Sequence, residues 1–428
     1  MKRILFTSIL ILCAIGAQSQ AGAVEKRLFE LPDLIFKPIE TPKGFEAAYE
    51  LHIKQPLDHK NPEKGHFYQR AYLSHRSFEA PMVLATEGYS RPSNRMYELT
   101  NYLEANQLDV EHRYFGSSVP DSLDYRFLKL KQVAGDLHRI RTLLGRVYEQ
   151  AWVSTGISKG GQTTIFYRYF YPNDVAASVP YVAPLNLELT DDRIYGFLDT
   201  VGTDECRAAI RETQLQLLQS REDALPRLKW HAKGAGMSFS YMSIEKAFEY
   251  AVLEYPFSFW QLGHDCSSIP AADAPIDTLL DHFVEVVGLG FYSDASMTAY
   301  ASHYYQAGDE MGYYGFQTAP FEGLLEEITE EEPTAIFMPG QAEMGFQPGF
   351  VEEVFEWTQR GADKMIYIYG AIDTWTATGV PVSEEVEAEW YIIPDKDHGS
   401  ARIHNMPAAD REALLSQLRK WIEKAKNE

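Results

Sequence analysis

A serine flanked by glycines, with an apolar run before it and a helix after it, is the feature that most restricts the fold. The run AWVST (151–155) is typical of a buried strand, and the G-x-S-x-G sequence at 156–160 follows it directly. Glycines two residues before and after Ser158 permit a strained turn and a close approach of strand and helix. The pattern alone is common, so the flanking strand and helix carry the argument. Together they predict a parallel α/β sheet with Ser158 raised above its edge.

Predicted strands alternate with amphipathic helices along most of the chain. Apolar residues between Val133 and Val147 recur at spacings that predict a helix, and further helices are predicted near 348–360 and 407–426. This alternation is typical of a mostly parallel sheet with crossover helices. The first two predicted strands are expected to be antiparallel. The predicted strands are 47–53, 66–73, 81–88, the start of 108–116, 151–155, 176–184, 334–340, 365–370 and 388–394.

The alternation stops between residues 185 and 330, where helical patterns rich in Leu, Tyr and Phe take over. We therefore expect one α/β core built from 24–184 and 331–428, with 185–330 inserted as a helical cap. Tyrosines near the end of this insertion suit apolar or proline side chains of a ligand, and the simpler alternative is that they form the core of the cap. They are Tyr304, Tyr305, Tyr313 and Tyr314.

The first 23 residues have the three parts of a secretory signal peptide. Lys2 and Arg3 precede an almost unbroken apolar run from Ile4 to Ile15, and small residues follow. The run is too short to span a bilayer as a stable helix. We expect residues 1–23 to be removed and the product to be secreted or periplasmic, without stable membrane insertion. The alternative is an N-terminal helix buried in the fold.

The charge and the motifs exclude several classes of function. The formal net charge is −22, and a chain this acidic repels phosphates, so no nucleic-acid partner is expected. No H-E-x-x-H sequence or paired-cysteine spacing is present. We therefore expect neither a metal nor another cofactor.

Export would permit disulfides, and Cys206 and Cys266 are the two cysteines that remain after removal of the signal peptide. A bridge between them would close a loop of about 60 residues, which in the chain-entropy model contributes about 4 kcal/mol. The alternative is two buried free thiols. Both cysteines fall inside the predicted insertion, so a bridge would staple the cap.

Ser158 needs a base and an acid, because a free serine hydroxyl is a weak nucleophile at neutral pH. In folds with this elbow the acid and then the histidine follow later strands. Asp373 comes three residues after the strand at 365–370, and His398 follows the strand at 388–394. Asp395 and Asp397 compete for the role of the acid, but they are too near His398 in sequence to orient it easily.

An oxyanion formed at Ser158 would need two backbone N–H donors. The residue after the nucleophile, Lys159, is expected to supply one, and Tyr89, in the loop after the strand at 81–88, is expected to supply the other. Glu111 and Arg113 would lie near this loop, where an internal ion pair between them is the simplest interpretation.

Long segments of the chain resemble a known family. The segment 155–186 (TGISKGGQTTIFYRYFYPNDVAASVPYVAPLN) is similar to the nucleophile region of the secreted bacterial tripeptidyl aminopeptidase family of serine peptidases. VEHRYFGSS, the two cysteines with FSFWQ before the second, and YYQAGDEMGYY fit the same family, which is related to prolyl carboxypeptidase and dipeptidyl peptidase II. The resemblance covers essentially the whole chain after the signal peptide.

The resemblance implies an α/β-hydrolase core with a helical cap and a triad at Ser158, Asp373 and His398. It also implies removal of short peptides from free N-termini, often with proline near the cut. One departure is that relatives carry proline after the acid, whereas this chain has Thr374. That leaves the triad intact and alters the neighbouring pocket.

We expect a secreted serine exopeptidase that releases tri- or tetrapeptides from peptides with free N-termini. Such an enzyme must hold the substrate ammonium, and Glu310 is the first choice for the carboxylate that binds it, with Glu87 second. The alternative is that both carboxylates are structural. Two other functions stay open: an ester hydrolase of the same fold, and an inactive binding protein on a hydrolase scaffold.

Overall fold

The computed structural model describes residues 21–329, 336–341 and 344–427. All but the last three residues of the predicted signal peptide lie outside these ranges. Residues 21–29 are helical, and Val24 and Leu28 are buried against the side chains of the sheet.

Within the described residues, nine strands form one sheet in the order β1-β2-β3-β5-β4-β6-β7-β8-β9. The first three strands and β5 pair in antiparallel fashion, and all pairs from β5 through β4 to β9 are parallel. The predicted α/β class with a mostly parallel sheet is thus confirmed. The strands are β1 (Leu34–Pro38), β2 (Ala47–Pro56), β3 (His66–His75), β4 (Met82–Thr86), β5 (Asn106–Val110), β6 (Trp152–Ile157), β7 (Ala177–Tyr181), β8 (Met365–Gly370) and β9 (Ala388–Ile393).

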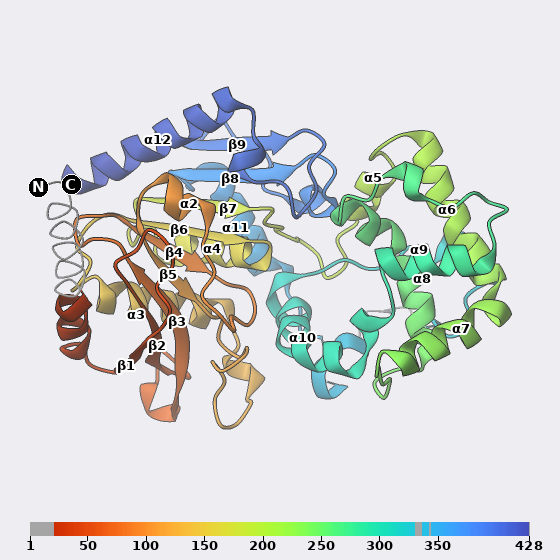
Figure 1. Cartoon of the computed structure of the whole chain (residues 1–428), viewed down its shortest axis with the longest axis horizontal. Coiled ribbons are helices and arrows are strands. Elements are labelled where there is room, and N and C mark those ends of the chain that lie inside the picture. Colours follow the sequence, from red (N-terminus) through yellow and green to blue (C-terminus); the bar gives the residue numbers. More distant parts are fainter. Residues whose placement is uncertain (1–20, 330–335, 342–343, 428) are drawn as a thin grey trace, which may run out of the picture.

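Helices cover both faces of the sheet, as Figure 1 shows. Alternate residues of a strand point to opposite faces, and β8 illustrates this: Tyr367 and Tyr369 pack with α4 and α11, whereas Ile366 and Ile368 pack with α12. Strands β4, β7 and β8 are buried on both faces and mostly apolar, whereas the edge strand β9 is only partly buried. The helices of this part are α2 (Glu98–Tyr102), α3 (Leu130–Leu144), α4 (Lys159–Phe170), α11 (Pro348–Arg360) and α12 (Ala408–Asn427).

Between β7 and β8 the chain forms a group of helices that lies beside the sheet (Figure 1). Its core is apolar and centred on α8, where Pro256 removes a backbone donor from the helix. The Val252 carbonyl accepts a hydrogen bond from Gln214 Nε2 of α6 at 2.8 Å. The helices are α5 (Arg193–Leu198), α6 (Asp204–Gln219), α7 (Arg221–Gly234), α8 (Ile244–Gln261), α9 (Ile276–Val286) and α10 (Asp294–Gln306).

The predicted strand at 334–340 is wrong for the part of it that the structure describes. Residues 336–341 form short helical turns and do not join the sheet. Phe337 instead packs on the rings of Tyr250, Tyr292 and Tyr304. The apolar run is therefore buried in the aromatic core of the inserted helices rather than in the sheet. We find no helix in the described residues that is long and apolar enough to cross a membrane.

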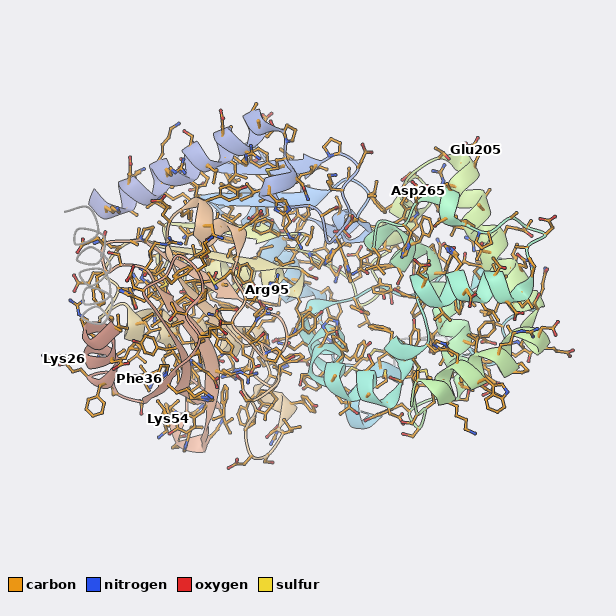
Figure 2. All side chains as sticks on the ribbon, viewed as in Figure 1. Lys26, Phe36, Lys54, Arg95, Glu205 and Asp265 are labelled. Atoms are coloured by element: carbon orange, nitrogen blue, oxygen red, sulfur yellow. A yellow bond between two sulfur atoms is a disulfide. The ribbon has the colours of Figure 1, made fainter. Side chains whose placement is uncertain are left out.

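Cys206 on α6 and Cys266 after α8 are joined by a disulfide. The preceding residues, Glu205 and Asp265, are labelled at the top of the inserted helices in Figure 2. Both ends of the bridge are therefore within the insertion.

We expect the Cys206→Ser, Cys266→Ser double variant to loosen the inserted helices before the sheet. The closed loop is 60 residues long, and in the chain-entropy model its loss destabilises the insertion by about 4 kcal/mol. Limited proteolysis followed by mass spectrometry would show new cleavage within 185–330 in the variant and not in the wild type. Equal protection of this segment in both proteins would contradict the prediction.

Candidate active site

The G-x-S-x-G segment forms the predicted turn between β6 and α4. Ser158 has φ 59° and ψ −126°, a strained backbone conformation for a residue other than glycine. A Cβ added to Gly156 would overlap the Gly160 backbone, and one added to Gly160 would lie 2.5 Å from the Thr86 carbonyl oxygen. The strand, the turn and the helix thus approach too closely for side chains at the two glycines.

His398 and Asp373 are joined by a hydrogen bond of 2.8 Å between Nδ1 and Oδ2. Asp373 is fully buried after β8, and its Oδ1 accepts from the Trp375 N–H at 3.1 Å. Ser158 and His398 both line one cavity of about 420 Å³. The structure therefore brings the predicted serine, histidine and Asp373 to one site.

The other predicted candidates for the acid lie elsewhere. Asp397 caps its own turn, because its carboxylate accepts from the backbone N–H groups of Gly399 and Ser400 and from the Ser400 hydroxyl. Asp395 is exposed. Within the described residues, Asp373 is the carboxylate bonded to His398.

The loop that carries His398 is held by both the sheet and the insertion. A Cβ on Gly370 at the end of β8 would overlap the Lys396 carbonyl, and the Ile372 N–H donates to that carbonyl at 3.2 Å. From the other side, the His398 N–H donates to the carbonyl of Gln261, the last residue of α8. Helix α8 thus helps to fix the position of the imidazole.

The loop after β4 packs directly on the start of α4. A Cβ on Gly88 would lie 2.5 Å from Lys159 Cβ, so only glycine fits there. Tyr89 lines the cavity with Ser158, and its N–H donates to no other group in the described part of the chain. The N–H of Lys159 opens α4 and has no acceptor within its helix. Both predicted oxyanion donors thus belong to segments that meet at Ser158.

The two carboxylates predicted to bind an ammonium do not line this cavity. Glu310 lies in a π-helical turn after α10, where its Oε2 accepts from the Leu130 N–H at 2.7 Å. Glu87 contacts the Arg91 guanidinium and the Tyr97 hydroxyl. Both carboxylates are thus already bonded to protein groups around the site.

Glu111 and Arg113 are both buried, but they do not pair with each other. Glu111 accepts from Arg70 at 2.5 Å and from the Arg91 N–H at 2.7 Å, which ties β3 to the loop after β4. Arg113 pairs with Asp136 of α3 at 2.6 Å. The expected ion pair is therefore replaced by two separate ones.

The carboxylate that does line the cavity is Glu254 of α8, which sequence reasoning missed. It is 5% exposed. Its Oε2 accepts from the Tyr314 hydroxyl at 2.8 Å and its Oε1 from the Ser258 hydroxyl at 3.0 Å. Burial raises the pKa of Glu254 to about 7. The signal in the sequence was an acidic residue inside the apolar run AVLEYPF, since glutamate is almost never buried unless it is paired.

Aromatic side chains form much of the cavity wall. Tyr313 and Tyr314 line the cavity, whereas Tyr304 stacks on Phe337 and Tyr305 stacks on Tyr125. Two of the four tyrosines singled out in the sequence thus face the site.

Within the described residues, no group of three or more His, Cys, Asp or Glu side chains is placed to hold a metal ion.

One protein family matches nearly the whole chain. The family described as PS-10 peptidase S37 matches residues 17–425. A prolyl tri/tetrapeptidyl aminopeptidase of Streptomyces mobaraensis is 31% identical over 437 residues, covering 98% of this chain and 91% of the relative. A putative serine protease of Caenorhabditis elegans is 26% identical over 216 residues, covering 46% of this chain and 38% of the relative.

Among solved structures, a proline iminopeptidase of Mycobacterium smegmatis aligns with 87% of this chain and 99% of its own, at 13% identity and a TM-score of 0.40. The family match over nearly the whole chain and the similarity to the Streptomyces relative show that this chain belongs to the PS-10 peptidase S37 family of serine peptidases.

Proposed function

We propose that this chain is an exported serine exopeptidase that releases tri- or tetrapeptides from the free N-termini of peptides, with proline favoured near the cut. The observation that carries the proposal is that Glu254, a buried carboxylate, shares one cavity with Ser158 and His398. Among the described residues no Lys or Arg pairs with Glu254. A substrate ammonium is the cation that this arrangement lacks.

The proposed chemistry uses the hydrogen bond between Asp373 and His398 and the cavity that His398 shares with Ser158. Ser158 attacks the scissile carbonyl, and His398 takes the serine proton and then gives it to the leaving amine. Asp373 accepts from Nδ1, which leaves Nε2 free to act as the base. Water then attacks the acyl-enzyme: His398 takes a proton from the water and returns it to Ser158 Oγ as the ester bond breaks and the peptide acid leaves.

Glu254 selects substrates whose end in the cavity carries a positive charge. A buried charge is costly unless it is paired, so an ionised Glu254 gains most from a ligand that brings a positive charge into the cavity. The free amino end of a peptide does this, and an acetylated end does not. The aromatic wall around it, which includes Tyr313, Tyr314 and Trp375, suits the apolar ring of proline.

Export is supported by the signal-peptide pattern of residues 1–23 and by the disulfide. Val24 and Leu28 are buried, so a mature chain that starts at Val24 keeps these contacts with the sheet and loses those of Ala21, whose carbonyl accepts from the Tyr49 hydroxyl. The disulfide fits an oxidising compartment. N-terminal sequencing of the protein from the periplasm or medium would locate the cleavage.

The test is a matched pair of peptides that differ only in acetylation of the N-terminus. In the wild type we expect cleavage of the free peptide to be strongly preferred. In Glu254→Gln, which keeps the shape of the side chain, we expect KM for the free peptide to rise about 100-fold, since losing one partner of a buried charge pair costs roughly 2–5 kcal/mol. KM for the acetylated peptide should barely change.

Glu310→Gln is the matched control, because Glu310 is also a partly buried carboxylate but does not line the cavity. It should leave the preference for free N-termini intact. If Glu254→Gln raised KM equally for the free and the acetylated peptide, Glu254 would not be the residue that binds the ammonium. Turnover of acyl esters without cleavage of either peptide would favour the ester hydrolase instead.

The same pair of peptides gives a pH test. With the pKa of Glu254 at about 7, the charged form that attracts an ammonium is the minor one below that pH and the major one above it. We expect KM for the free peptide to fall as the pH rises from about 5.5 to about 7.5, below the range in which the substrate α-amino group, with an ordinary pKa of about 7.7–8.0, loses its proton. The acetylated peptide shares His398 but not the ammonium, so it corrects for the titration of the imidazole. Glu254→Gln should lose the difference between the two profiles.

A further inference from the structure

The side chain of Lys159 is buried directly behind the nucleophile. It is 3% exposed, and its Nζ donates to the Gly88 carbonyl at 2.8 Å and to Gln306 Oε1 at 2.7 Å. The rings of Tyr89 and Phe115 lie around it, with centroids 5.3 and 4.6 Å from Nζ. Within the described residues no carboxylate forms an ion pair with this amine. Such a costly group calls for a reason beyond packing.

The Gly88 carbonyl that Lys159 binds is one half of a peptide unit, and the Tyr89 N–H is the other half. A peptide unit is planar and normally trans, so its C=O and N–H point in opposite directions. A hydrogen bond that fixes the direction of the Gly88 oxygen therefore also fixes the direction of the Tyr89 N–H. That N–H is one of the two donors expected to face the oxyanion.

We propose that Lys159 is a positioning residue that organises both halves of the oxyanion hole: its backbone N–H is one donor, and its side chain holds the peptide unit that carries the other. The proposal rests on the proposed role of Ser158 as the nucleophile. The second contact, to Gln306 at the end of α10, joins this peptide unit to the inserted helices as well.

The role does not depend on the charge of the amine. Burial holds the pKa of Lys159 well below its usual value. Both partners of Nζ are acceptors, and a neutral amine still has two N–H donors for them. A side chain of similar length without a donor is therefore the informative replacement.

In Lys159→Met we expect kcat to fall about 100-fold, the lower end of what loss of one oxyanion donor costs. KM should stay within about twofold, because the ground-state carbonyl needs the hole less than the transition state does. The melting temperature should fall modestly, since methionine leaves the Gly88 carbonyl and Gln306 Oε1 without their donor. A merely structural lysine would lower the melting temperature in the same way but leave kcat near normal at a temperature where the variant is folded.

A fluorophosphonate probe supplies a readout that does not depend on peptide specificity. Phosphonylation of Ser158 also places an oxygen in the oxyanion hole, so its rate should fall with kcat in Lys159→Met. Lys129→Met is the matched control, because Lys129 is a partly buried lysine that pairs with Asp309 away from Gly88. It should react at the wild-type rate.

The outcomes are separable. A wild type that the probe does not label would overturn the proposed function itself. A labelled wild type together with wild-type kcat and labelling rate in Lys159→Met would overturn the role of Lys159. If Lys159→Met does not fold, Lys159→Gln is measured by the same criteria, because its shorter side chain cannot reach both Gly88 and Gln306.

Discussion

Replacing Ser158 with alanine should lower kcat for peptide hydrolysis by about 10⁶-fold and leave the fold intact. The elbow itself is built by glycines, by the Ser158 N–H donating to the Tyr181 carbonyl at 2.9 Å, and by the packing of β6 on α4. None of these uses the serine hydroxyl. The measurement is single-turnover hydrolysis of a free peptide, with circular dichroism to check the fold. Labelling by a fluorophosphonate should be lost at the same time.

His398→Ala should be about as damaging as the serine variant, because the two residues act as a unit in the transfer of one proton. His404→Ala is its matched control. His404 follows the same strand and also has a carboxylate partner, with Nδ1 2.7 Å from Glu98 Oε2, but it is largely exposed and does not line the cavity. Near-normal turnover in His398→Ala, or a comparable loss in His404→Ala, would contradict the assignment of the base.

The elbow and its partners could be predicted because they depend on short-range and topological rules. Glycines at 156 and 160 are required by contacts at the strand–turn–helix unit. This unit can be recognised from a short stretch of sequence. Asp373 and His398 could be placed because the carboxyl ends of parallel strands meet at one edge of the sheet. Neither inference needed knowledge of how distant segments pack.

Features decided by distant contacts could not be predicted in this way. The apolar run near Phe337 reads like a strand, but a run of apolar residues does not say whether a sheet or an aromatic cluster will bury it. The choice of Glu310 failed to anticipate the Leu130 N–H, a partner 180 positions away in sequence. The location of Glu254 depends on how α8 packs against the turn Thr374–Thr378 that follows β8. The sequence indicates only that a glutamate lies within an apolar helix.

Asp373→Asn should lower kcat by about 10⁴-fold while the protein stays folded. The aspartate holds His398 in the tautomer with the proton on Nδ1 and stabilises the imidazolium that forms during catalysis. An asparagine amide that donates to Nδ1 would stabilise the opposite tautomer, whose Nε2 is protonated and cannot act as the base. The fall should appear in kcat for free and acetylated peptides alike, because the defect lies in the proton transfer.

Asp397→Asn is the control that separates the acid of the triad from an acid that only shapes the loop. Asp397 lies next to His398 in sequence, yet its carboxylate accepts from Gly399 and Ser400. Its amide variant weakens that turn and should lower the melting temperature, with kcat changed by less than about tenfold. The reverse result, with Asp397→Asn severe and Asp373→Asn mild, would mean that the 2.8 Å contact of Asp373 with the imidazole is structural and that the acid comes from the histidine loop itself.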